Sequence, residues 1–207
     1  MRYLYLHGFA SGPKSTKGVA FEQHFAPKGI RIERLDLRVP SFEHLRLSAM
    51  IEKVRAELDD HTVLIGSSLG GLCAARVAEN EKRVKGLVLL APAFKLAERW
   101  RTALGSQFDD WRDTGWRQVL DYTTGQPARI DFGFFEDCAR IDRGWPRIEC
   151  ETLIMHGRRD ETVSIDGSRE LATVNPQIRL VELDDGHELV ASLPTLLAET
   201  EVFLEGI

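Results

Sequence analysis

Short, mostly apolar segments recur along the chain, and each is typical of a β-strand. The run Gly86–Ala91 is continuously apolar, which predicts an interior strand covered on both faces. Residues 30–37 instead alternate apolar and charged side chains, which predicts a half-exposed strand near the edge of the sheet. The predicted strands cover residues 2–6, 30–37, 63–65, 86–91, 151–155 and 178–183.

Segments with apolar residues three or four positions apart separate these strands and predict amphipathic helices. We expect Ser41 to cap the second helix, and Pro194 stands at the first-turn position where a final helix tolerates proline. The predicted helices are 17–26, the stretch after Ser41 to about 58, 69–80, 165–174 and the C-terminal segment. Strands that alternate with helices predict an α/β fold with a parallel sheet and right-handed crossovers.

Residues 93–147 interrupt this alternation, because no clear interior strand occurs there. The interval holds ten of the chain's 17 aromatic residues, including all four tryptophans. A connection this long is commonly a functional lid, so we expect two or three short helices across the carboxyl edge of the sheet. Its aromatics either wall an acyl pocket, with Trp111 and Trp116 as candidates, or form a small core of their own.

The stretch Val63–Gly71 is the strongest chemical signal, because Gly66, Ser68 and Gly70 match the G-x-S-x-G nucleophile elbow between a strand and a helix. A serine on such a tight turn projects its hydroxyl above the sheet, and close passage of the chain favours flanking glycines. The neighbouring Ser67 is the rival nucleophile, although it occupies an x position. The alternative is a glycine-rich turn without chemistry.

A serine hydroxyl becomes a strong nucleophile when a base, itself oriented by a carboxylate, takes its proton. The elbow motif predicts the chain order serine, acid, histidine. His187 follows the last predicted strand and Asp160 follows the one before it, and carboxyl ends of parallel strands lie at the same edge. These residues are therefore the candidate base and acid, and the competing acids are Glu161, Asp184 and Asp185.

The remaining histidines are weaker candidates for chemistry. His7 and His156 each follow an apolar strand and precede glycine, so we expect partly buried rings that bind loop backbone. His24, His44 and His61 have polar neighbours and are expected at the surface. No histidine, cysteine or carboxylate grouping has metal-ligand spacing, and no lysine follows the elbow glycines as in a phosphate loop, so we expect neither a metal nor another cofactor.

Composition narrows the setting of this chemistry. The 207 residues suffice for one α/β domain, and the net charge of −5 disfavours nucleic acid and anionic membranes as partners. No apolar run approaches the ~20 residues that span a bilayer. The N-terminal segment lacks a signal-peptide pattern, and the three separated cysteines are typical of reduced thiols, so we expect a cytoplasmic protein.

Together, His7-Gly8-Phe9, the elbow, the Asp160 loop and Gly186-His187 resemble the α/β-hydrolase superfamily, and more closely the small bacterial YqiA-like esterases. The resemblance covers the chain outside residues 93–147, where cap segments vary. It implies a three-layer fold with a shortened sheet of about six mostly parallel strands, because the two usual leading strands are missing. The topological switch point is then expected between strands 2–6 and 63–65.

The resemblance also implies roles for the site residues. Ser68 is the nucleophile, Asp160 the acid and His187 the base, while the backbone N–H groups of Phe9 and Leu69 form the oxyanion hole. We therefore expect a serine hydrolase of carboxylic esters or thioesters that acts on a small molecule with an apolar acyl or aryl group. The alternatives are an acyltransferase with the same triad and a non-catalytic binding protein on this fold.

Overall fold

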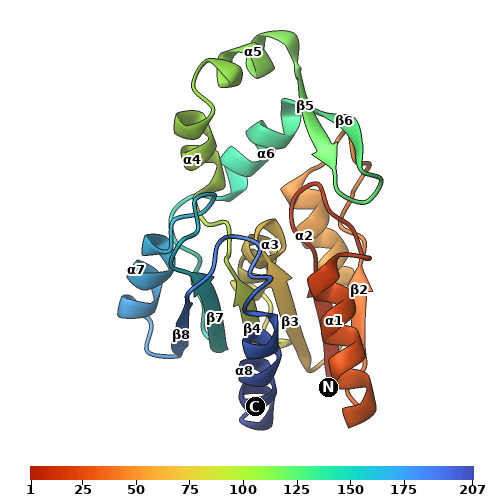
Figure 1. Cartoon of the computed structure of the whole chain (residues 1–207), viewed down its shortest axis with the longest axis vertical. Helices are drawn as coiled ribbons and strands as arrows, with labels where there is room; N and C mark the ends of the chain where they lie inside the picture. Colours follow the sequence, from red (N-terminus) through yellow and green to blue (C-terminus); the bar gives the residue numbers. More distant parts are fainter.

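A parallel sheet with helices on both faces forms the body of the molecule (Figure 1). The computed structural model describes residues 1–207, and its six-stranded sheet has the order β2-β1-β3-β4-β7-β8. This confirms the predicted α/β class and the six parallel strands. The strands are β1 (Arg2–Leu6), β2 (Ile32–Leu35), β3 (Thr62–Ser67), β4 (Val84–Leu90), β7 (Glu151–Gly157) and β8 (Ile178–Leu183).

The strand order reverses at β1, which pairs with β2 on one side and with β3 on the other. The predicted switch point between β1 and β3 is therefore confirmed. The chain leaves β1 and β3 in opposite directions across the sheet, so a crevice opens outside their carboxyl ends. The His7–Pro13 loop and the elbow both begin at this crevice.

Two apolar clusters cover the sheet, one on each face. Val63 and Ile65 of β3 pack in the cluster that includes α1 (Thr16–Phe25) and α8 (Leu193–Glu205), whereas Leu64 packs in the cluster with α2 and α3. Such alternation along a strand buried on both faces explains its continuous apolar run. None of the helices combines the length and apolarity that a bilayer crossing requires. The other helices beside the sheet are α2 (Leu47–Ala56), α3 (Leu69–Ala78), α7 (Asp166–Val174) and the single turn η1 (Ala26–Lys28).

The start of α2 differs from the sequence-based expectation. The helix begins at Leu47, and the Ser41 hydroxyl accepts a hydrogen bond from the His44 N–H in a turn that precedes it. The carboxylate of Asp137, 89 residues away, instead accepts from the Ser48 N–H at 2.8 Å. A cap supplied by a distant residue leaves no local sequence pattern, so the prediction of Ser41 as the N-cap is wrong.

Residues 93–147 form a separate layer, called the cap below, at the end of the molecule opposite both termini (Figure 1). It contains the expected short helices and also an antiparallel hairpin that the sequence did not reveal. The hairpin strands bury few side chains and one contains Pro127, so they lack the apolar run of an interior strand. The elements are α4 (Leu96–Ala103), α5 (Ser106–Thr114), β5 (Trp116–Asp121), β6 (Gln126–Asp131) and α6 (Gly133–Ile141).

Polar contacts attach the cap to the sheet layer at two ends. Beyond α6, the buried carboxylate of Asp142 pairs with Arg76 of α3 at 2.9 Å and accepts from the Leu96 N–H at 2.7 Å. At the hairpin, the Tyr122 N–H donates to the carbonyl of Ala10 at 2.9 Å. The cap therefore contacts the loop that follows β1, beside the crevice.

Candidate active site

The elbow has the steric features that its sequence predicts. Ser68 lies between β3 and α3 with φ 53° and ψ −114°, a strained conformation for a residue with a side chain. A Cβ atom on Gly66 would lie 2.4 Å from the Gly70 carbonyl oxygen, and one on Gly70 would lie 2.1 Å from that of Leu6. Both positions therefore need glycine, because β1, the turn and α3 pass too close for any side chain.

The structure brings the three predicted triad side chains into one hydrogen-bonded chain. The His187 Nε2 atom lies 3.0 Å from Ser68 Oγ, and its Nδ1 atom lies 2.7 Å from Asp160 Oδ2. Ser68 follows β3, Asp160 follows β7 and His187 follows β8. Three loops that are distant in sequence thus meet at the carboxyl edge of the sheet.

The carboxylate of Asp160 is buried and fully hydrogen-bonded. Its Oδ1 accepts from the N–H groups of Thr162 at 2.9 Å and Val163 at 2.7 Å, and its Oδ2 faces His187 and His156. Burial by itself raises the pKa of this carboxyl group, but the hydrogen bonds from the two histidines and from Val163 outweigh it and hold the pKa well below its usual range. Asp160 is therefore an anion beside His187.

His156 is the site residue whose contact with the acid the sequence did not reveal. Its ring is fully buried, and Nε2 lies 3.1 Å from Asp160 Oδ2 and 2.9 Å from the Val163 carbonyl. Both neighbours are acceptors, so Nε2 carries the proton, and Nδ1 accepts from the Ser168 hydroxyl at 2.8 Å. The expected backbone contact is present. The sequence signal for the second contact is that His156, at the end of β7, and Asp160, in the loop that follows, are four residues apart.

The competing residues lie outside this hydrogen-bonded chain. Glu161 is exposed, and Asp184 pairs with Arg159 at 3.2 Å on the surface. The Asp185 carboxylate accepts from the N–H groups of Gly186 and Ser192, so it caps the turn that presents His187. Ser67 is buried at the end of β3 and forms no hydrogen bond with His187.

Two backbone donors remain unused beside Ser68. The N–H groups of Phe9 and Leu69, the residues expected to form an oxyanion hole, donate to no other group of the protein. Leu69 is the first residue of α3, where a helix leaves its N–H groups free. The loop that carries Phe9 is held by His7, whose Nδ1 donates to the Gly8 carbonyl and whose Nε2 accepts from the Leu37 N–H. His7 is thus a buried residue that binds loop backbone, as expected.

A cavity of about 440 Å³ contains Ser68 and His187. Its cap-facing wall is apolar and includes Phe9, Leu96 and Trp100, while Tyr122 of the hairpin turn also contributes. The expectation for Trp111 and Trp116 is wrong. Trp111 is buried with its indole N–H donating to the Ile130 carbonyl, and Trp116 lies beneath Arg129, 4.1 Å from ring centre to guanidinium.

Most cap aromatics pack against one another. The rings of Phe108 and Phe135 are 4.7 Å apart, and Trp100 contacts Phe9 at 5.1 Å and Trp111 at 5.8 Å. The two alternatives for these aromatics are therefore both partly realised. Trp100 and Tyr122 line the cavity, while Phe108, Trp111, Phe134 and Phe135 are buried in an apolar cluster that is continuous with the one around α2 and α3.

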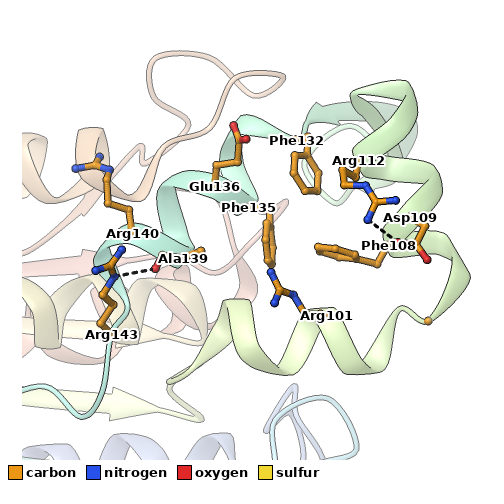
Figure 2. A pocket seen from close by; sticks show the side chains of 11 residues that line it. Arg101, Phe108, Asp109, Arg112, Phe132, Phe135, Glu136, Ala139, Arg140 and Arg143 are labelled. Carbon is orange, nitrogen blue, oxygen red and sulfur yellow. Dashed lines mark hydrogen bonds and ion pairs between the residues drawn. The ribbon is translucent and has the colours of Figure 1, made fainter.

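A larger cavity, of about 850 Å³, lies within the cap between α4, α5 and α6 (Figure 2). Its floor contains Phe108 and Phe135, and arginines surround it. Two of these are already paired, Arg112 with Asp109 and Arg140 with Asp137. None of the triad residues lines this cavity, so the candidate chemistry belongs to the smaller one.

A family model described as "Uncharacterised protein family (UPF0227)" matches residues 2–198, nearly the whole chain. The chain belongs to the UPF0227 family. The match includes all the elements that carry the triad and the cap. A curated relative of this UPF0227 chain is a Mycoplasma pneumoniae protein whose name places it among esterases and lipases. The two are 28% identical over 141 residues, 58% of this chain and 50% of the relative, so the match spans about half the relative's length.

Solved structures of α/β-hydrolases share the fold of this UPF0227 protein. Alpha/beta hydrolase domain-containing protein 10 from mouse superposes with a TM-score of 0.81 at 19% identity, covering 99% of this chain and 89% of the mouse chain. Est1E from Butyrivibrio proteoclasticus, with ferulic acid bound, gives 0.81 at 21% identity and covers 99% and 88%. The expected α/β-hydrolase fold is thus confirmed.

Proposed function

We propose that this protein is a serine hydrolase of carboxylic esters or thioesters, with Ser68 as nucleophile, His187 as base and Asp160 as orienting acid. The observation that carries the proposal is the unbroken hydrogen-bonded chain from Ser68 through His187 to an ionised Asp160, at 3.0 and 2.7 Å. This chain opens into a cavity with an apolar wall, as an ester with an apolar acyl or aryl group requires.

In the first half-reaction, His187 Nε2 takes the Ser68 proton while Oγ attacks the acyl carbon. The oxyanion that develops accepts hydrogen bonds from the Phe9 and Leu69 N–H groups, and losing one such donor costs about 3–4 kcal/mol in a known enzyme. His187 then passes its proton to the departing alcohol or thiol. The second half-reaction repeats these steps with water as the nucleophile, and it releases the acid from Ser68.

Asp160 contributes by orienting the base. Its Oδ2 accepts from His187 Nδ1, which leaves Nε2 unprotonated and directed at Ser68. When His187 becomes a cation during the reaction, the nearby negative charge stabilises it. His156 and the Thr162 and Val163 N–H groups hold the carboxylate in that orientation.

The relatives support the choice of an ester as substrate. The Mycoplasma pneumoniae protein is named among esterases and lipases, and Est1E was solved with ferulic acid, an aromatic carboxylic acid, bound to it. A carboxylic acid is the product that ester hydrolysis leaves behind. We extend this chemistry to the present chain because its own Ser68 and His187 have the required geometry.

We also propose that residues 93–147 act as a lid over the acyl group. Leu96 and Trp100 lie four positions apart on α4, so both face the cavity. Tyr122 reaches it from the hairpin turn, where its N–H binds the carbonyl of Ala10. Apolar side chains at these positions exclude water from the acyl chain and stabilise it by burial.

The proposal is tested by trapping the acyl-enzyme. Brief mixing with 4-nitrophenyl butyrate, followed by acid quench, is expected to increase the protein mass by one butyryl group located on the peptide that carries Ser68. An ester and thioester panel then gives the turnover, and added alcohols distinguish hydrolysis from acyl transfer. A protein that neither turns over any ester nor gains the acyl mass would contradict the proposal and favour a binding protein.

Replacing Trp100 with alanine is expected to change the ranking of acyl lengths. The change removes part of the apolar wall, so the ratio of kcat/KM between octanoyl and acetyl esters should shift by about tenfold. The matched control is Trp111→Ala, which lies in the core behind the wall. It should lower the free energy of unfolding by about 3–5 kcal/mol without altering the ranking. An unchanged ranking in Trp100→Ala would remove the case for an acyl wall in the cap.

A further inference from the structure

The cavity that holds Ser68 is positively charged, although the whole chain carries a net charge of −5. Its lining includes the cations Lys14, Lys17 and Arg99, of which Lys14 is exposed, and the only acidic residue there is Glu188. The Glu188 side chain is 76% exposed, so water largely screens the charge of its carboxylate. An excess of cations around a cavity favours an anionic ligand.

Tyr5 provides a second, independent observation in the same part of the cavity. This residue of β1 lines the cavity and is 1% exposed, yet its hydroxyl has no hydrogen-bond partner. An unpaired buried hydroxyl is costly, so native proteins rarely keep one without a ligand or water to bind it. Burial raises the pKa of the Tyr5 phenol, and the neighbouring Ser15 and Ser67 hydroxyls only partly oppose this, so the phenol stays protonated and able to donate to an anion.

Lys17 contacts the residue that follows the proposed base. Its Nζ donates to the Glu188 carbonyl at 2.6 Å, one residue after His187, and lies 3.7 Å from the Glu188 carboxylate. The Lys17 side chain is 13% exposed, and burial lowers the pKa of its amine despite the nearby carboxylate. The ammonium group has three N–H donors, so donors remain for a ligand.

Arg99 has a different role. Its Nε donates to the Phe94 carbonyl at 3.0 Å and its Nη1 to the Thr162 carbonyl at 2.8 Å. Arg99 therefore joins α4 to the loop that follows Asp160. It contributes positive charge to the cavity, and two backbone carbonyls fix the position of its guanidinium.

The two sides of the cavity thus differ in chemistry. Leu96 and Trp100 of α4 make one side apolar, while Lys14 and Lys17, at the start of α1, and Tyr5 make the other side cationic and hydrogen-bonding. His187 donates its proton to the leaving group, and Lys17 contacts the residue that follows it. A leaving group that His187 protonates can therefore lie on the cationic side.

We propose that Tyr5, Lys14 and Lys17 form a subsite for an oxyanion, a carboxylate or phosphate, on the alcohol or thiol portion of the substrate. The assignment of that portion rests on the proposed function. The apolar acyl group then lies against the cap, and the substrate is an amphipathic ester with an anionic leaving group. Lys17 and Lys14 supply charge, and the Tyr5 hydroxyl donates a hydrogen bond.

Paired esters test the subsite. 4-Acetoxybenzoate carries the anion on the leaving group, and 4-acetoxybenzamide is its neutral isostere. In a second pair, mono(4-nitrophenyl) glutarate carries the anion on the acyl group and 4-nitrophenyl glutaramate is its neutral counterpart. A further ester, 4-acetoxyphenyl phosphate, distinguishes phosphate from carboxylate. We expect kcat/KM to favour the anion by at least about tenfold in the leaving-group pair but not in the acyl pair.

Variants identify the residues that form the subsite. For each variant, the ratio of kcat/KM between the anionic and the neutral ester is divided by the same ratio in the wild type, so the intrinsic reactivity of each ester cancels. Tyr5→Phe and Lys17→Gln should each lower the anion-to-neutral ratio by about tenfold, and Lys17→Arg should restore most of it. The matched controls are Tyr3→Phe, two residues earlier on the same strand, and Lys82→Gln, an exposed lysine outside the cavity. Both should keep the wild-type ratio. Equal losses in the controls would overturn the assignment.

Direct binding separates the subsite from catalysis. In Ser68→Ala protein, calorimetry should show 4-hydroxybenzoate binding at least about tenfold more tightly than 4-hydroxybenzamide, and Tyr5→Phe should remove that difference. If neutral esters form the acyl-enzyme but neither rates nor binding favour the anion, the subsite is wrong and the hydrolase stands. If the anion binds selectively but no ester acylates the protein, the subsite stands and the hydrolase is wrong.

Discussion

Replacing Ser68 with alanine is expected to lower kcat/KM on an activated ester by about 10⁴–10⁶-fold and to abolish labelling by a fluorophosphonate. The Ser68 hydroxyl is the hydrogen-bond partner of His187 Nε2, at 3.0 Å. Without it, the base has no nucleophile to activate. The variant should keep its thermal stability, because the change removes one hydrogen bond to a partly exposed ring. Initial rates, labelling and a melting curve on the same preparation check all three expectations.

Ser67→Ala is the matched control for this prediction. Ser67 is the adjacent serine, but it belongs to the buried end of β3 and does not contact His187. Its replacement should keep labelling and most of the turnover. Labelling that survives in Ser68→Ala and disappears in Ser67→Ala would show that the neighbouring serine is the nucleophile.

Replacing Asp160 with asparagine is expected to lower kcat/KM by at least about 10²-fold, and the same change in a known protease costs about 10⁴-fold in kcat. Asparagine keeps the shape of the side chain, but it removes the charge that stabilises the His187 cation. The carboxylate also accepts four hydrogen bonds, from two histidine rings and two backbone N–H groups. The NH2 group of asparagine would face N–H groups that donate to the carboxylate in the wild type. His187 is therefore expected to adopt the tautomer that cannot take the Ser68 proton.

Three neighbouring acids provide controls for Asp160. Glu161→Gln and Asp184→Asn alter exposed side chains, while Asp185→Asn weakens the cap of the His187 turn. Each should stay within roughly tenfold of the wild type, because none contacts His187. All four variants are compared on one activated ester at neutral pH. Near-normal kcat/KM in Asp160→Asn, together with a large loss of kcat/KM in one control, would identify that control residue as the orienting acid.

The strands and the elbow could be predicted because their signals are local. Leu87, Val88 and Leu89 are apolar without interruption, since an interior parallel strand contacts helices on both faces. Gly66 and Gly70 flank Ser68 because the chain passes within van der Waals contact there. Such steric demands determine the residue type at each position, so the pattern can be recognised before any contact is known.

The positions of Asp160 and His187 could be predicted for a different reason. Both directly follow apolar strands, and parallel strands end at a common edge of the sheet. The sequence alone could not exclude Glu161, Asp184 or Asp185, since carboxylates one or two residues away satisfy the same rule. The direction of each side chain decides between them, and that direction depends on the loop conformation.

The features that the sequence did not reveal depend on contacts that no local sequence pattern indicates. Asp137 caps α2 from α6, the Tyr122 N–H donates to the Ala10 carbonyl, and the buried His156 ring contacts Asp160. The hairpin of the cap contains too few buried residues to give the apolar pattern that predicts a strand.

The sequence by itself thus determined the parallel sheet, the switch point and the three loops that carry the candidate triad, because apolar periodicity and tight-turn sterics act over a few residues. Only the tertiary structure decided that Trp100 rather than Trp111 faces the cavity. It also decided that the buried hydroxyl of Tyr5 is unpaired beside Lys17. Those properties depend on which segments pack around a side chain, and no local pattern of residues records that.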